Sequence, residues 1–152
     1  MTFSIVGMCE RTAMAGVAIT TSSISVGSRC PWVRAGAGAV ATQNVTDPSI
    51  GNEMLDLMAQ GTDAPSALAS VMDERPFAEY RQVTAVDLNG NIAERTGTEI
   101  LGTHAVSHGD QCVAAGNLLS SIRVPAAMTE GFAQHAGSHL AERLLCALEA
   151  GV

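Results

Sequence analysis

TFSIVG, residues 2–7, follows Met1 directly and predicts the buried β-strand from which the fold is built. Thr2 opens this strand, and a small residue at position 2 is accepted by the enzymes that remove the initiator methionine. An α-amine has a pKa near neutrality, so a terminal Thr2 can use its own amine to take the proton from its hydroxyl. Thr2 is therefore a candidate nucleophile. The alternative interpretation is an ordinary threonine near an ordinary chain start.

The composition restricts the class of partner. At 152 residues the chain is long enough for one domain, residues 1–152, with a sizeable core. The net charge is −7 and the basic residues are not clustered, which argues against nucleic acid and against an anionic membrane surface. Charged residues make up only 15% of the chain, so we expect apolar contacts between copies in a homo-oligomer.

All cationic side chains are arginine, and lysine is absent. This excludes Schiff-base and lysine-base chemistry. Arginine does not act as a base at ordinary pH, so its expected role in a site is to bind a carboxylate or a similar planar anion. The four cysteines form no CxxC pair, no leader precedes the first strand, and no apolar run is long enough to span a membrane. We therefore expect free, buried thiols and a cytoplasmic protein.

Strand and helix patterns alternate in runs along the chain. A polar turn at residues 9–12 joins two strands in a hairpin, and Asn89-Gly90 is a strong signal for a second hairpin. A pair of amphipathic helices follows each group of strands. The predicted strands are 2–8, 13–22, 39–43, 80–88, 91–98 and 112–117, the predicted helices are 51–60, 64–74, 123–135 and 138–149, and residues 26–38 are expected to be irregular. Runs of antiparallel strands and runs of helices predict an α+β fold.

Two patterns resemble cofactor or metal sites only weakly. Residues 36–41 match a GxGxxA dinucleotide motif, but they lead into a strand where the motif requires a helix, so we interpret these glycines as close packing between sheet layers. His104 and His108 are four residues apart, as are His135 and His139. The first pair lies in an expected loop, and the helical pattern breaks between the members of the second. No cofactor and no metal are therefore predicted.

Uncharged amides stand at the ends of predicted strands, at Gln43, Asn44 and Asn117. Each can orient a substrate or contribute to an oxyanion hole, and each can equally satisfy the backbone of a turn. Cys30 follows Arg29 directly. It is either a thiolate stabilised by the neighbouring positive charge or a buried, inert thiol.

Several short segments, taken together and in order, are typical of one family. They are TFSIV (residues 2–6), GVA (16–18), SVG (25–27) leading to Pro31-Trp32, GAVATQ (38–43), YRQ (80–82), VD (86–87) with Gly90, TG (96–97) and AGNLL (115–119). They cover nearly the whole chain. In number and order they resemble the domain-of-unknown-function family 1028 of the N-terminal-nucleophile hydrolase-like superfamily.

This resemblance implies a four-layer α/β/β/α sandwich of two antiparallel sheets, with helices on both outer faces. It also implies that the first residue of the first strand, here Thr2, is the nucleophile in amide hydrolysis through a covalent acyl intermediate. The sequence departs from the family pattern in three places. Relatives carry a lysine near the end of the second strand, where this chain has Ser22 or Ser23, and they continue with a further strand beyond the last helix, so the domain is expected to be incomplete at Val152. A retained Met1 would block the amine of Thr2.

Two hypotheses follow for the function. In the first, the protein is a hydrolase of amide (C–N) bonds in a small-molecule substrate, with Thr2 as nucleophile and the oxyanion stabilised by the Gly116 backbone and the Asn117 side chain. Arg29 or Arg95 would bind a substrate carboxylate. The remaining expected substrate-binding residues are Ser22, Gln43 and Asn44. In the second hypothesis, the protein is a non-catalytic ligand-binding or assembly protein on the same fold.

Overall fold

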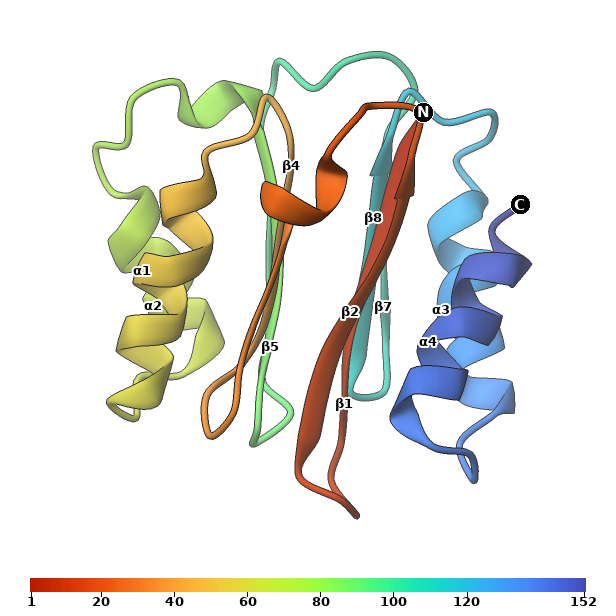
Figure 1. The fold of residues 1–152 in the computed structure, drawn as a ribbon. Helices are drawn as coiled ribbons and strands as arrows, with labels where there is room; N and C mark the ends of the chain where they lie inside the picture. Colours follow the sequence, from red (N-terminus) through yellow and green to blue (C-terminus); the bar gives the residue numbers. More distant parts are fainter.

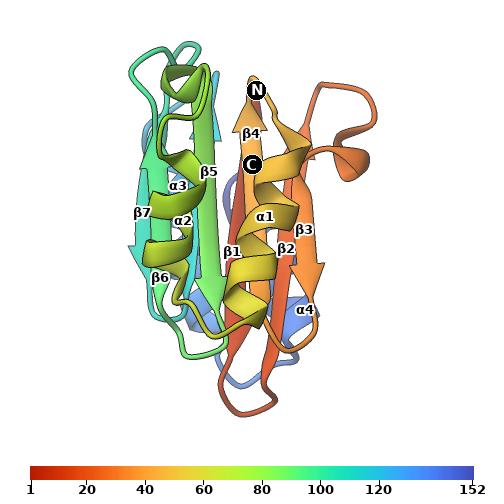
Figure 2. The same ribbon diagram turned by 90° about the vertical axis from the view of Figure 1, so that its left-hand side faces the viewer.

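Two four-stranded antiparallel sheets lie face to face in the computed structural model, which describes residues 1–152 (Figure 1). The first sheet has the strand order β2 (Met14–Thr21), β1 (Thr2–Cys9), β8 (Cys112–Asn117), β7 (Ala105–Gly109). The second has the order β3 (Pro31–Arg34), β4 (Gly38–Asn44), β5 (Arg81–Asp87), β6 (Ile92–Thr96). Helices α3 (Val124–Gln134) and α4 (Leu140–Ala150) cover the first sheet, and α1 (Pro48–Ala59) and α2 (Ala64–Met72) cover the second (Figure 2). The α+β class and the four-layer α/β/β/α sandwich are confirmed.

Three apolar interiors hold the four layers together. Phe3 and Phe132 lie in the interior between the first sheet and its helices, and Met54 lies in the one between the second sheet and α1 and α2. Small and branched residues such as Val6 and Ala41 fill the space between the sheets. The central strands are therefore buried on both faces, which explains why they appear in the sequence as continuous apolar runs without alternation.

The helices begin where their capping residues predict. Asp47 accepts a hydrogen bond from the Ser49 backbone N–H at the start of α1, and Pro48 occupies the first helical position, where the missing N–H costs nothing. The helix therefore starts three residues before the predicted residue 51. Asp63 caps α2 in the same way, and Gly61 adopts a left-handed φ of 94° after α1. None of the four helices combines the length and the apolar character needed to cross a membrane.

Two edge strands were not predicted. Residues 31–34, expected to be irregular, form β3, and His108, expected in a loop, lies on β7. Both strands are short and half-exposed, and β3 begins with a proline. Such edge strands lack the apolar continuity of a central strand, so the sequence pattern is weak there. Figure 2 shows β3 and β2 along one side of the sandwich and β6 and β7 along the other.

The glycines of the GxGxxA match serve the turn between β3 and β4. Gly36 has φ 79° in that turn, and Gly38 has φ 150° at the start of β4. A Cβ atom on Gly38 would collide with the backbone carbonyl of Val86 on β5. The close approach is therefore between neighbouring strands of one sheet, and the interpretation as packing between sheet layers was wrong.

Asp87, at the end of β5, ties the second hairpin to the helical layer. Its side chain is buried and accepts hydrogen bonds from the backbone N–H groups of Asn89 and Asn91, from the Asn91 amide, and from the backbone N–H of Ala64 at the start of α2. The Asp87 carboxylate thus stabilises the predicted Asn-Gly turn.

Replacing Asp87 by alanine is expected to lower the free energy of unfolding by about 2–3 kcal/mol, because hydrogen bonds to a charged group contribute strongly and the Ala64 N–H would be left buried without an acceptor. Chemical denaturation monitored by circular dichroism measures this. Asp110→Ala, an exposed acid in the turn between β7 and β8, is the matched control. Equal stability of the two variants would contradict the assignment.

Candidate functional site

One end of the sandwich, here called the N-terminal pole, carries the start of β1 and the end of β8 (Figure 1). Within the first sheet Thr2 lies between Thr21 on β2 and Asn117 on β8. The connections that reach this pole are residues 22–30, 45–47, 73–80, 97–104 and 118–123, and they include the 3-10 turns η1 (Val26–Ser28) and η2 (Ala78–Tyr80). The topology therefore places the first residue of the first strand among loops from both sheets.

Thr2 faces a small polar cavity. Its Oγ1 lies 2.7 Å from Oγ1 of Thr21. The cavity has a volume of about 20 Å³, room for about one water molecule, and its lining includes Thr2, Arg29, Gln43 and Asn44. Three residues expected to bind substrate are thus brought together with the candidate nucleophile.

Met1 extends the β1–β2 pairing by one residue. Its carbonyl accepts a hydrogen bond of 3.3 Å from the Ser22 N–H, and its amine donates one of 3.4 Å to Ser22 Oγ. Ser22 therefore lies beside the chain start and outside the lining of the Thr2 cavity. Removing Met1 would expose the new amine of Thr2 on this side.

Arg29 brings a positive charge to the cavity. Its guanidinium donates to Thr46 Oγ1 at 3.1 Å and to the Ile24 carbonyl at 3.0 Å, and no carboxylate of the protein pairs with it. The neighbouring Cys30 is buried. Burial raises the pKa of the Cys30 thiol, and the charge of Arg29 lowers it by less. The thiol is therefore protonated at neutral pH, as the inert reading predicted.

A line of buried polar side chains crosses the space between the two sheets behind Thr2. Ser4 Oγ donates to Gln43 Oε1 at 2.8 Å, and Gln43 Nε2 donates to Gln82 Oε1 at 2.8 Å. Gln82 Oε1 also accepts from Asn117 Nδ2 at 3.3 Å, while Gln82 Nε2 donates to the carbonyl of Gly116 at 3.3 Å. All four side chains are at least 97% buried. We call this line, Ser4–Gln43–Gln82–Asn117, the polar ladder.

Asn44 holds the loops of the pole in place. Its amide nitrogen donates to the Tyr80 carbonyl at 2.8 Å, and its carbonyl oxygen accepts from the Leu101 N–H at 3.2 Å. The residue has a left-handed φ of 73°, which asparagine tolerates better than most residues. The nitrogen and the oxygen of the side-chain amide are thus both bonded to backbone groups, which is the turn-stabilising role considered for Asn44 in the sequence. Asn44 also lines the cavity.

Arg95 lies elsewhere. It is exposed on β6 and lines a groove of about 620 Å³ that also includes residues of α2 and His108 of β7. Arg29 therefore lines the same cavity as Thr2, whereas Arg95 lines a separate groove.

Three of the four histidines make local contacts. Nδ1 of His104 and of His135 lies within hydrogen-bond distance of a backbone carbonyl, and His139 caps the start of α4. Nowhere do three histidine, cysteine or acidic side chains come together as a metal site requires.

Sequence reasoning assigned no role to three residues of the site. Thr21 is the hydrogen-bond partner of Thr2, and Ser4 and Gln82 complete the polar ladder. Gln82 and Ser4 are polar residues inside apolar strands, and this is a signal that buried polar side chains have partners across the core. The register that joins them is set by the packing of the two sheets, which no local pattern encodes.

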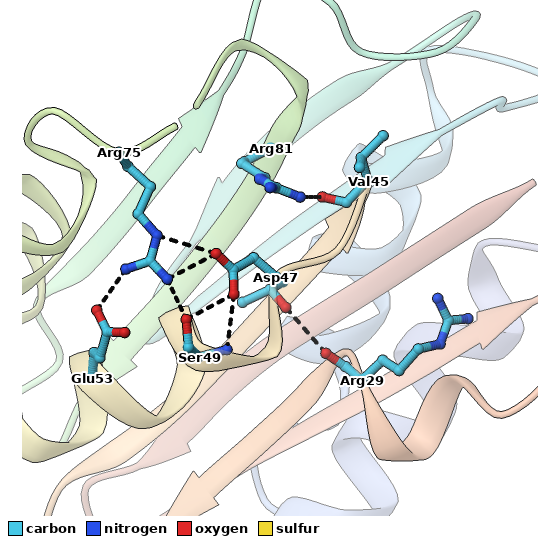
Figure 3. Close-up of polar contacts among 8 residues, drawn as sticks. Arg29, Val45, Asp47, Ser49, Glu53, Arg75 and Arg81 are labelled. Atoms are coloured by element: carbon cyan, nitrogen blue, oxygen red, sulfur yellow. Dashed lines mark hydrogen bonds and ion pairs between the residues drawn. The ribbon is translucent and has the colours of Figure 1, made fainter. Parts of the chain in front are cut away.

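A second polar cluster lies at the start of α1, near the pole (Figure 3). Arg75 donates to the Asp47 carboxylate at 2.8 Å and to Glu53 at 2.6 Å, and it also contacts Ser49 Oγ. Burial raises the pKa of Asp47, but hydrogen bonds from Arg75 and Ser49 lower it by more, so its pKa lies below the ordinary value of 3.8. Arg81 lies nearby, bonded to the Val45 carbonyl. The cluster fastens the segment after α2 to α1.

Because the folded pKa of Asp47 is depressed, its charge stabilises the fold fully above pH 3.8 and progressively less as the pH falls through the folded value. Asp47→Asn, which keeps the helix cap but not the charge, is expected to lower the free energy of unfolding by about 1 kcal/mol at pH 7, a magnitude limited by partial solvent exposure. At pH 2.5, below the ordinary pKa of 3.8, the difference from the unmodified protein should be smaller. Denaturation at both pH values measures this. Asp56→Asn, which removes the exposed ion pair with Arg34, should change little at either pH.

Comparisons with known proteins agree with the resemblance of the sequence segments. The sequence model of a family of unknown function, DUF1028, matches residues 2–152. The crystal structure of a protein from Silicibacter pomeroyi, described by the same family model, superposes with a TM-score of 0.92 at 32% sequence identity. The match covers 99% of this chain and 69% of that one. No curated protein matches the sequence.

Proposed function

The chain belongs to the DUF1028 family, whose function is unknown, and we propose that it is an amide hydrolase of the N-terminal-nucleophile type. The single observation that carries this proposal is the position of Thr2. It begins the central strand β1, and it lines a polar cavity at a pole built from loops of both sheets. Removal of Met1 would put an α-amine on the same residue as the hydroxyl.

The chemistry follows from these two groups. The neutral α-amine of Thr2 takes the hydroxyl proton as Oγ1 attacks the amide carbonyl of the substrate. The tetrahedral intermediate collapses, the C–N bond breaks, and the leaving amine takes the proton from the α-ammonium. Water then attacks the ester on Oγ1, with the amine again as base, and releases the carboxylic acid and the free hydroxyl.

The neighbouring residues supply charge stabilisation and binding. Asn117 Nδ2 donates one of its two N–H groups to Gln82, and the second N–H would donate to an oxyanion. The Gly116 N–H is the other proposed donor, but it lies within the paired part of β8, between Phe3 and Ala105, so Asn117 is the more available of the two. Arg29, which has no carboxylate partner in the protein, would bind a substrate carboxylate, with Gln43 as a neighbour in the cavity.

A β-lactone probe tests the nucleophile directly. Opening of the lactone by Thr2 Oγ1 forms an ester and adds the whole probe mass to the chain. We expect one probe per chain, on Thr2, in protein without Met1, and none in Thr2→Ala. Intact-mass and peptide mass spectrometry measure the label. Labelling at another residue, or none in Met1-free protein, would contradict the proposal.

The alternative is a ligand-binding or assembly protein, and the small size of the Thr2 cavity favours it, since a space of about 20 Å³ cannot enclose a substrate. Under this alternative the protein is a homo-oligomer whose copies meet through the exposed apolar side chains. Sedimentation velocity that finds a stable oligomer, together with an unlabelled Thr2, would support it.

A further inference from the structure

Exposed large apolar side chains are concentrated at one end of the molecule. Eleven such residues are exposed, and all except Val33, Leu145 and Val152 belong to the N-terminal pole. Single apolar residues scattered over a surface are normal, whereas a group gathered at one place marks a surface that a ligand or partner covers. This surface lies at the same end of the molecule as the candidate site.

Four of these residues are connected by backbone contacts or by chain neighbourhood to residues that line the Thr2 cavity, and we call them the apolar rim: Ile24, Val45, Leu101 and Leu118. The Ile24 carbonyl accepts a hydrogen bond from the Arg29 guanidinium, and Val45 follows Asn44 directly in the chain. Leu101 donates its N–H to Asn44 Oδ1, and Leu118 donates its N–H to the Leu101 carbonyl at 3.0 Å. Because Arg29 and Asn44 line the cavity, each rim residue is at most two contacts from a residue of the cavity lining.

One residue of the rim, Leu118, has a costly backbone conformation. Leu118, immediately after Asn117, has φ 51°, in the left-handed region that a bulky residue rarely occupies. Its side chain is 49% exposed, so its own fold gains little from burying it. Strain of this kind persists where the surrounding structure enforces it, and it is concentrated at functional sites. An asparagine or glycine would adopt this φ at lower cost, and the exposed half of the leucine side chain is open to a ligand.

We propose that the substrate of the Thr2 site carries an apolar acyl group that lies across the apolar rim, with a carboxylate on the amine side bound by Arg29. This inference rests on the proposed hydrolase function and names its substrate class as N-acyl amino acids with long acyl chains. The cavity holds about one water, so no more than the carbonyl oxygen of the scissile amide enters it and the acyl chain stays outside. The rim is the apolar surface adjacent to that opening.

The affinity of Thr2→Ala protein for N-acetyl-, N-hexanoyl- and N-octanoylglycine tests the rim without requiring turnover. We expect about two- to fourfold tighter binding for each added methylene, the upper value corresponding to full burial. Octanoylglycine should thus bind about 60-fold more tightly than acetylglycine even at the lower value. Isothermal titration calorimetry measures the series. Equal affinity for all three compounds would overturn the inference.

The double variant Leu101→Ser with Leu118→Asn, made in the Thr2→Ala protein, should flatten the chain-length dependence to less than about tenfold over the series, since both apolar surfaces are lost. Asparagine accepts the left-handed backbone at position 118, which protects the fold. Leu145→Ser is the matched control, because Leu145 is 56% exposed on α4, outside the pole. An unchanged slope in the double variant, or an equal loss in the control, would contradict the proposal.

The same compounds separate this inference from the hydrolase proposal. If affinity rises steeply with acyl-chain length but Met1-free protein releases no glycine, the rim binds acyl chains and the hydrolase proposal fails. If glycine is released at the same rate from all three compounds, the hydrolase proposal survives and the rim inference fails. If the double variant dissociates an oligomer without changing the slope, the rim is a contact between copies and the inference is overturned.

Discussion

Protein that keeps Met1 is expected to hydrolyse N-acylglycines on the order of 10⁴-fold more slowly than protein that begins at Thr2, a loss comparable to changing the residue that orients the base of a serine protease. With Met1 in place, the nitrogen of Thr2 is an amide and cannot take a proton. The Met1 chain also covers the side of Thr2 that faces Ser22. The base is therefore lost in the longer form.

Two preparations of the same chain measure this effect, one released from a cleavable fusion at Thr2 and one at Met1. Glycine release is followed for both, and intact mass verifies each N-terminus. Thr2→Ala in the shorter form should be as slow as the Met1 form, whereas Thr2→Ser, which keeps a hydroxyl and an amine, should retain most of the rate.

Thr21→Val is the matched control for the surroundings of the hydroxyl. It removes the hydrogen-bond partner 2.7 Å from Thr2 Oγ1 but leaves the nucleophile and its amine intact. We expect a loss of about tenfold, the size of one neutral hydrogen bond. Full activity in the Met1 form would refute the mechanism, because no free amine would then be needed.

The central strands and the helices could be predicted because each carries a local signal. The apolar runs of β1, β4 and β8 and the Asn-Gly turn before β6 are visible in short windows, as are the acidic caps Asp47 and Asp63. The strands β3 and β7 have no such signal, because an edge strand needs only one paired side and tolerates polar residues. Leu145 is exposed on α4, because the buried face of that helix passes through Leu140, Leu144 and Ala147.

The candidate site could be predicted only where residues lie at strand ends. Thr2, Gln43 and Asn44 were named because they begin or end strands, and the structure gathers them with Arg29 around one cavity. Arg95 was named for its charge alone, and charge does not determine which face of the sandwich a residue occupies. The polar ladder joins residues 39 and 35 positions apart, from Ser4 to Gln43 and from Gln82 to Asn117, and contacts of that range depend on how the sheets pack.

Replacing Gln82 by alanine is expected to lower the free energy of unfolding by about 3–5 kcal/mol, because the change leaves a cavity and orphans several buried polar groups. Gln82 is fully buried, and its amide serves Gln43, Asn117 and the Gly116 carbonyl at once. For a chain of this length the loss corresponds to a fall in melting temperature of roughly 10 °C. Thermal and chemical denaturation measure it. Gln134→Ala, at the exposed end of α3, should change stability by less than about 0.5 kcal/mol.

The ladder can be separated from simple cavity formation with methionine, which has nearly the volume of glutamine and no hydrogen-bonding amide. Gln82→Met should still be clearly destabilising, because the amides of Gln43 and Asn117 lose their acceptor. The double variant Gln43→Met with Gln82→Met should lose less than the sum of the two single variants, since removing both partners leaves fewer buried groups unpaired than removing one. Additive losses would mean that the two glutamines contribute independently.

The same substitution links the core to the site. Asn117 lies opposite Thr2 in the sheet, and its side chain donates a hydrogen bond to Gln82. Without the Gln82 amide, the side chain of Asn117, the proposed oxyanion donor, is free to rotate. We therefore expect Gln82→Met protein, assayed below its melting temperature, to hydrolyse N-acylglycines with a lowered kcat and a nearly unchanged KM. If kcat is unaffected while stability falls, the ladder serves folding alone and the oxyanion is stabilised elsewhere.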